Sequence, residues 1–218
     1  MLDKLVAKLK SLMPVRAVFD PSRFGDPVAV QTAWTPVKGG GTNFQTHKLT
    51  RVEANRIEFR ATLGAKLFGG IFLMAGLAVM CIVPASQVSS GMWSAGLLIP
   101  VLMGAVFAGL GGGMLYWFTS PIVFDATRGF FWKGRRSPGE AGNISELKTC
   151  VRLGDIHALQ IISEYCTGNK SSYYSYELNM VMADASRINV VDHGNLAKLR
   201  SDARVLAEFL GKPLWDAL

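Results

Sequence analysis

The strongest pattern along the chain is a pair of long apolar runs separated by a short uncharged segment. The first run covers residues 65–83, with Lys66 at its edge as its only charge, and the second covers residues 95–118 without any charge. A helix rises about 1.5 Å per residue, so each run is long enough to cross a hydrocarbon core of about 30 Å. Two such runs in one small chain favour a transmembrane helical hairpin over a pair of buried core helices.

The distribution of charge orients this hairpin. Lysines and arginines lie on both outer sides of the two runs, and residues 84–94 between them carry none. By the positive-inside rule, both termini then lie in the cytoplasm and the connecting segment lies outside. We therefore predict a multi-pass protein of the bacterial inner membrane.

Small residues recur at helical spacing in the second run. Such rows allow helix backbones to approach closely in lipid. The predicted packing face consists of two rows, Gly104, Ala108 and Gly112, and Ala105, Gly109 and Gly113. Two partners for this face remain open: the first helix of the same chain, or another protein or a second copy of the chain.

The segments before the first run combine a helical pattern with strand patterns. Residues 1–13 place apolar side chains on one helical face and lysines off it, so this helix could lie on the membrane, dock on a partner or cover the chain's own domain. Residues 14–27 contain three prolines and are predicted to be a linker. Residues 28–62 alternate in a way that predicts strands at 28–37, 43–51 and 56–62.

Strand patterns resume directly after the second run, in residues 121–218. Strands are predicted at 122–124, 129–133, 147–153, 155–165, 174–182 and 187–191. The segment 174–182 alternates apolar and polar residues, which predicts a strand with one face buried. A helix is predicted at 195–210, with Asn195 as its N-cap and Gly211 at its end.

This order of elements resembles a pleckstrin-homology-like (PH-like) domain. Residues 151–161 fit V-x-L-x-D-I-x-x-L-x-I, a pattern of bacterial membrane-anchored PH-like domains, and residues 124–134 are similar to the opening hairpin of such domains. A transmembrane hairpin followed by such strands and a closing helix is also similar to photosystem I assembly factors with two membrane spans. The resemblance covers about residues 122–218, half of the chain, and the strands at 28–62 depart from that pattern. The predicted fold class is thus an α+β membrane protein, with a transmembrane hairpin and a PH-like antiparallel β-barrel or sheet capped by a C-terminal helix.

The net charge of +7 adds one candidate surface site. Four basic residues follow the second run within about twenty residues: Arg128, Lys133, Arg135 and Arg136. They could attract anionic lipid or a partner protein, or they could only fix the orientation of the hairpin. Because no dense basic run is interleaved with aromatic residues, nucleic acid is not a predicted partner.

Residues with catalytic or metal-binding chemistry are sparse. The histidines and the cysteines lack the spacing of metal ligands, and no metal or cofactor is predicted. Asp192 and His193 could form an acid–base pair of a hydrolase-like enzyme, but as neighbours at a helix start they fit a capping turn better.

Taken together, these patterns predict a non-enzymatic inner-membrane scaffold, assembly factor or accessory subunit. Its PH-like domain and its hairpin would bind membrane lipid and a partner protein, and the chain could also form a homo-oligomer. The alternatives are a sensor of anionic lipid and, more remotely, an enzyme that uses Asp192 and His193.

Overall fold

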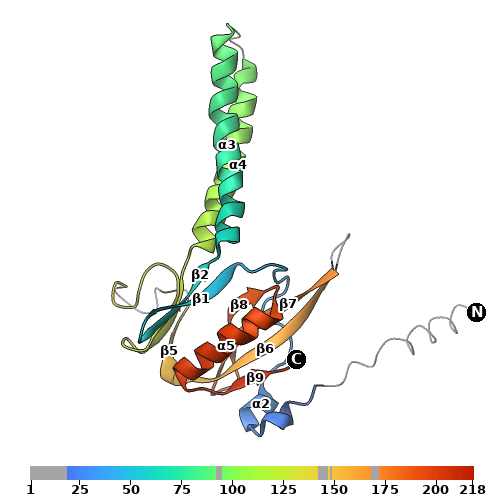
Figure 1. The fold of residues 1–218 in the computed structure, drawn as a ribbon, viewed down its shortest axis with the longest axis vertical. Helices are drawn as coiled ribbons and strands as arrows, with labels where there is room; N and C mark the ends of the chain where they lie inside the picture. Colours follow the sequence, from blue (N-terminus) through green and yellow to red (C-terminus); the bar gives the residue numbers. More distant parts are fainter. Residues whose placement is uncertain (1–18, 92–94, 142–146, 148, 168–171) are drawn as a thin grey trace, which may run out of the picture.

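The computed structural model describes residues 19–91, 95–141, 147, 149–167 and 172–218, so the helix predicted at 1–13 lies outside the described residues. The described chain has an α+β fold, in which a helical hairpin extends from one end of a β-rich domain (Figure 1). Its strands form a five-stranded antiparallel sheet in the order β1-β2-β3-β4-β5 and a four-stranded sheet in the order β8-β7-β6-β9.

The elements follow one another along the chain as two short helices, two strands, the hairpin and the remaining domain. The five-stranded sheet comprises β1 (His47–Glu53), β2 (Arg56–Ala61), β3 (Ile122–Asp125), β4 (Phe130–Lys133) and β5 (Cys150–Arg152). The four-stranded sheet comprises β6 (Ile156–Thr167), β7 (Ser172–Met182), β8 (Arg187–His193) and β9 (Leu214–Asp216). The helices are η1 (Pro21–Phe24), α2 (Pro27–Gln31), α3 (Leu63–Ser89), η2 (Ala95–Leu97), α4 (Leu98–Phe118), η4 (Leu153–Asp155) and α5 (Leu196–Leu210).

Helices α3 and α4 are both long and apolar enough to cross a membrane. Only 11% of the most apolar part of either helix is buried within the chain, so most of their apolar side chains are exposed. Helix α3 extends beyond the predicted span of 65–83 at both ends: it begins at Leu63, after its N-cap Thr62, and it continues past Pro84 to Ser89. In this last part of the helix, the hydroxyl of Ser86 donates to the Val83 carbonyl and that of Ser89 donates to the Ser86 carbonyl.

The hairpin joins neighbouring strands of the five-stranded sheet. Thr62 separates β2 from α3, and its hydroxyl accepts a bond from the Ala65 N–H and donates one to the Gln45 carbonyl. The return from α4 to β3 takes residues 119–121, and Arg135 donates to the hydroxyl of Thr119 at 2.7 Å. Because β2 and β3 pair directly, the two helices leave the sheet side by side (Figure 1).

The main core lies between the two sheets and is closed by α5. Phe59, Phe124 and Phe131 of the five-stranded sheet meet Leu159 and Leu178 of the other sheet. The predicted end signals of α5 are confirmed: the Asn195 side chain accepts from the Lys198 N–H, and Gly211 takes a left-handed conformation.

The strand predicted at 28–37 is wrong, and the strand predicted at 43–51 begins only at His47. Residues 21–24 and 27–31 are helical, because Asp20 and Asp26 each cap a helix whose first residue is proline. The strand predicted at 28–37 is therefore replaced by α2 and irregular chain. We call residues 19–46 the N-terminal arm. It packs on the outer face of the four-stranded sheet, where Phe24 and Trp34 of the arm contact Trp215 of β9.

The strands predicted after the hairpin are present, but β7 differs from its predicted burial. Ser175, Glu177 and Asn179, the polar positions of its alternation, are fully buried rather than exposed. The N-terminal arm covers this face, so both faces of β7 are buried.

Candidate functional site

A cleft of about 800 Å³ lies where the two sheets approach each other at β5 and β8. Its walls come from β4 and β5 on one side and from β8 and the N-terminal arm on the other. The lining residues are Val37, Lys38, Lys133, Leu147, Thr149, Cys150, Val151, Arg187, Ile188 and Asn189. Its volume lies in the range of about 300–1,000 Å³ that is typical of ligand sites.

Both strands that flank the cleft are the terminal strands of their sheets. The Met182 N–H donates to the Ser186 carbonyl, and Met180 pairs with Ile188. Since hydrogen-bonded and non-hydrogen-bonded pairs alternate along antiparallel strands, the N–H and C=O groups of Arg187 and Asn189 point away from β7. By the same alternation, Cys150 and Arg152 turn their main chains away from β4. The cleft is therefore flanked by two strand edges.

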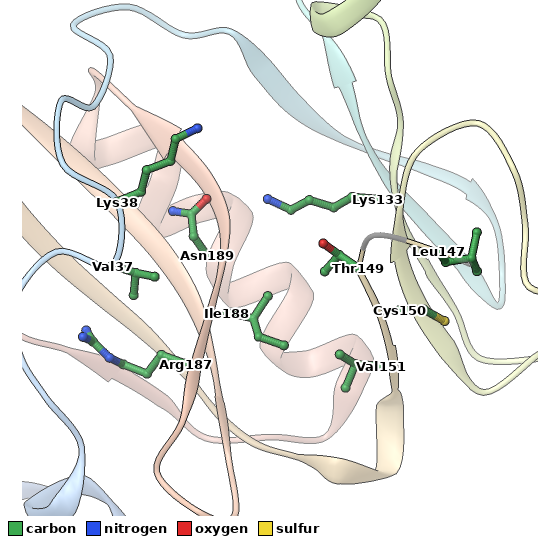
Figure 2. A pocket seen from close by; sticks show the side chains of 10 residues that line it. All are labelled: Val37, Lys38, Lys133, Leu147, Thr149, Cys150, Val151, Arg187, Ile188 and Asn189. Atoms are coloured by element: carbon green, nitrogen blue, oxygen red, sulfur yellow. The ribbon is translucent and has the colours of Figure 1, made fainter. Parts of the chain in front are cut away.

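Two lysines reach into this cleft from opposite walls. Lys133 extends from the end of β4 toward Asn189, and Lys38 approaches from the N-terminal arm (Figure 2). Among the described residues, neither ammonium group lies within 4.0 Å of a carboxylate oxygen. Thr149, Val151 and Ile188 point into the gap beside them, and Val151 and Ile188 give it an apolar floor (Figure 2).

The surroundings of Lys133 make its charged form less stable than it would be in water. Burial is the main cause that lowers the pKa of its ammonium group to about 8; Asp192 opposes this shift, and Lys38 contributes to it. Burial also lowers the pKa of His47, with Lys133 as the second cause, and raises the pKa of Asp192. Lys133 thus keeps a proton at neutral pH in a place where the charged form is poorly solvated.

Replacing Lys133 by methionine is expected to raise the free energy of unfolding at pH 7 by about 1–3 kcal/mol, because it removes a poorly solvated charge. In the wild-type chain, the lysine pKa is lower in the folded state than in the unfolded state. The unfolded chain therefore binds more protons between about pH 8 and pH 10.5, and stability due to Lys133 rises with pH across that window. The measurement is denaturant unfolding of both proteins in mild detergent from pH 7 to pH 10; a difference that stays constant with pH would contradict the prediction.

Lys38 is held in place by a buried carboxylate. Glu177 of β7 is fully buried, and its Oε1 accepts the Lys38 N–H at 3.0 Å while its Oε2 accepts the Val37 N–H at 2.9 Å. Further along the arm, Glu164 of β6 accepts the N–H groups of Gly40 and Gly41. The sheet thus binds the main chain of the arm through two carboxylates, and the arm supplies one wall of the cleft.

The predicted basic cluster is not a single patch. Arg128 lies in the β3–β4 turn, near Asp125, at the end of β4 opposite to Lys133. Arg135 folds back on the end of α4, with its guanidinium 4.4 Å from the centre of the Tyr116 ring. Arg136 is exposed, and Lys133 enters the cleft. The four residues are close in sequence, but the short strand β4 places Arg128 and Lys133 at its opposite ends.

The predicted packing face of α4 is divided in the same way. Gly104 and Gly111 lie against the backbone of α3, together with Ala108, which faces Gly76. At Gly109, Gly112 and Gly113, an added Cβ would meet no atom of the described chain within 4 Å apart from the helix's own nearby backbone, and Ala105 is exposed. The contacting glycines are seven residues apart in each helix, because the pair follows a heptad seam rather than a row of every fourth residue.

Asp192 and His193 do not form the acid–base pair of the enzyme alternative. They are successive residues of β8 and project to opposite faces of the sheet. Asp192 accepts a bond from the Asn189 amide at 2.8 Å, and His193 Nδ1 accepts the Asn195 N–H at 2.9 Å. The His193 ring is only 1% exposed, so a substrate cannot reach it.

Comparison of the chain with protein-family models, with curated proteins and with solved structures gives no match. The assignment of a function therefore depends on the geometry alone. Sequence reasoning singled out Lys133 but missed Lys38, Arg187 and Asn189 as its neighbours. The available signal for Lys38 was its position before Gly39-Gly40-Gly41, a sequence that favours close approach of the backbone to another element.

Proposed function

We propose that this chain is a non-enzymatic scaffold, assembly factor or accessory subunit of the bacterial inner membrane, whose PH-like domain binds a partner protein. Helices α3 and α4 cross the bilayer, with both termini in the cytoplasm. Large apolar side chains such as Ile71, Leu102 and Val106 are more than half exposed on these helices, and lipid is the solvent that accepts such a surface.

The observation that carries the proposal is the direct connection between the hairpin and the sheet. One residue joins β2 to α3, three join α4 to β3, and Arg135 bonds the end of α4. A tether that merely keeps a domain near a membrane needs no such connection. A fixed orientation of the domain instead favours recognition of another membrane-associated protein, since ordering entropy is then lost before binding.

The anionic-lipid alternative depended on one juxtamembrane patch. With Arg128 at the far end of β4 and Lys133 inside the cleft, the four basic residues would not meet one membrane surface together. Partner binding is therefore the better-supported function, and a PH-like arrangement of two sheets closed by α5 suits it.

The test is purification of the tagged full chain from its native membranes in two mild detergents. The chain is expected to stay with the membranes at alkaline pH and to co-purify with the same second protein, in comparable amount, in both detergents. The matched control is the same preparation with a tagged, unrelated two-span protein. Release of the chain at alkaline pH would contradict the membrane assignment, and recovery of this chain alone would contradict the scaffold function.

A further inference from the structure

We propose that the cleft between β5 and β8 binds an extended, acidic segment of a partner protein. The proposal rests on the proposed function, because it names the surface and the kind of partner segment that would be recognised. Its occupant follows from three properties of the cleft: its charge, its strand edges and its apolar floor.

The charge of the cleft selects an anionic occupant. Lys38 and Lys133 bring two ammonium groups that lack a carboxylate partner among the described residues. The carboxylates nearby are engaged: Glu177 accepts two main-chain N–H groups, and Asp192 accepts the amide of Asn189. Two carboxylates from outside would replace the water that the partly buried ammonium of Lys133 lacks.

The strand edges select an extended main chain. Arg187 and Asn189 direct their N–H and C=O groups away from β7, on the side of β8 that borders the cleft. A strand added to such an edge gains main-chain hydrogen bonds, and its side chains alternate between two faces. Alternate side chains would meet the lysines on one face and Thr149, Val151 and Ile188 on the other (Figure 2).

The N-terminal arm covers only part of the β8 edge in the described chain. The N-terminal arm already pairs with β8 at the opposite end of the strand, where Gln45 forms a bridge with His193. Gly194 allows this close approach, since an added Cβ would lie 2.6 Å from the Phe44 nitrogen. The arm thus covers one end of the β8 edge and leaves residues 187–189 to the cleft.

The test uses the full chain in nanodiscs of phosphatidylcholine, a neutral lipid, at low ionic strength. The probe is a fluorescent hexapeptide of alternating glutamate and valine, measured by fluorescence anisotropy. We expect saturable binding that weakens at least tenfold in the Lys38→Gln/Lys133→Gln variant. The charge-matched control, Lys48→Gln/Arg204→Gln, removes two exposed basic residues elsewhere and is expected to bind as the wild type does.

Two further probes separate strand addition from charge alone. The same peptide with alternate backbone nitrogens methylated keeps its carboxylates but loses main-chain donors, and it is expected not to bind. Equal binding of this peptide, or equal weakening in both variants, would overturn the proposal. The second probe is short-chain phosphatidylglycerol. If it binds saturably in a manner that depends on Lys38 and Lys133, and the hexapeptide does not bind, the proposal is overturned, because the occupant would then be a lipid headgroup.

The outcome is distinguishable from failure of the proposed function. If the hexapeptide does not bind while the second protein still co-purifies with the Lys38→Gln/Lys133→Gln variant, the cleft is rejected and the scaffold function stands. Because the substitution at Lys133 removes a poorly solvated charge, loss of binding is not expected to arise from unfolding; the denaturant transition of the variant verifies this.

Discussion

Replacing Gly76 by valine is expected to lower the stability of the helical hairpin by about 3 kcal/mol or more, since no space exists for even one added carbon. A Cβ at this position would lie 2.6 Å from the Gly104 carbonyl oxygen and 2.8 Å from the Ala108 Cα, and it would overlap the Ala108 nitrogen. All three are backbone atoms, which cannot rotate away. The helices would have to separate, and the contacts at Gly104 and Gly111 would be lost along the whole seam.

The matched control for this prediction lies on the same helix. Gly70→Val adds the same side chain where, among the described residues and apart from the helix's own nearby backbone, no atom lies within 4 Å of an added Cβ, so it is expected to leave the packing intact. The measurement is the fraction of monodisperse protein on size-exclusion chromatography after heating in detergent. We expect the apparent Tm of Gly76→Val to fall by about 10 °C relative to the control. Equal transitions for the two variants would mean that the helices do not pack along this seam.

The second large effect is expected from Glu177→Ala, which should detach the N-terminal arm. The Glu177 carboxylate is fully buried and accepts the N–H groups of Val37 and Lys38 and the Asn179 amide at 3.1 Å. Alanine leaves these three donors without their acceptor. Since an unsatisfied buried donor costs about 1–3 kcal/mol, we expect a loss of about 3–5 kcal/mol, expressed first as local opening of residues 33–42.

A matched control is again present in the chain. Glu164 also accepts two successive N–H groups, from Gly40 and Gly41, but it lies near the surface, where water can replace it. Glu164→Ala is therefore expected to lower stability by less than about 1 kcal/mol. Hydrogen exchange followed by mass spectrometry measures both effects on the amides of the arm. Unchanged protection of these amides in Glu177→Ala would show that other contacts, such as the Trp34 packing, hold the arm.

Predictions from local patterns agreed with the structure where a single element carries its own signal. Helix α5 has a polar cap, an apolar stripe and a terminal glycine, and its bounds differ from the predicted ones by one residue. Strands β3 and β4 pair across a tight turn, so their register is set within a few residues. The short helices of the N-terminal arm were predictable as well, since Asp-Pro at residues 20–21 and 26–27 is a helix-start signal.

Predictions of which element covers a given face of a strand or helix were less successful, and the physical reason is the same for β7 and for α4. Alternation along β7 shows that Ser175 and Glu177 share one face, but it does not show that the N-terminal arm covers that face. Helical spacing places Gly111 and Gly112 side by side, and only the heptad geometry of the pair decides which of them faces α3. In both cases, the burial of a face depends on an element that is distant in sequence, so the pattern of the face itself does not show it.

The sequence by itself determined the two apolar helices, the strands that follow them and the closing helix α5, because each follows from composition and periodicity over a few turns or residues. The tertiary structure alone decided that Lys38 and Lys133 share a cleft, that Arg128 does not, and that Glu177 is buried under the arm. These relations join segments about a hundred or more residues apart, and no local pattern records a contact over that separation.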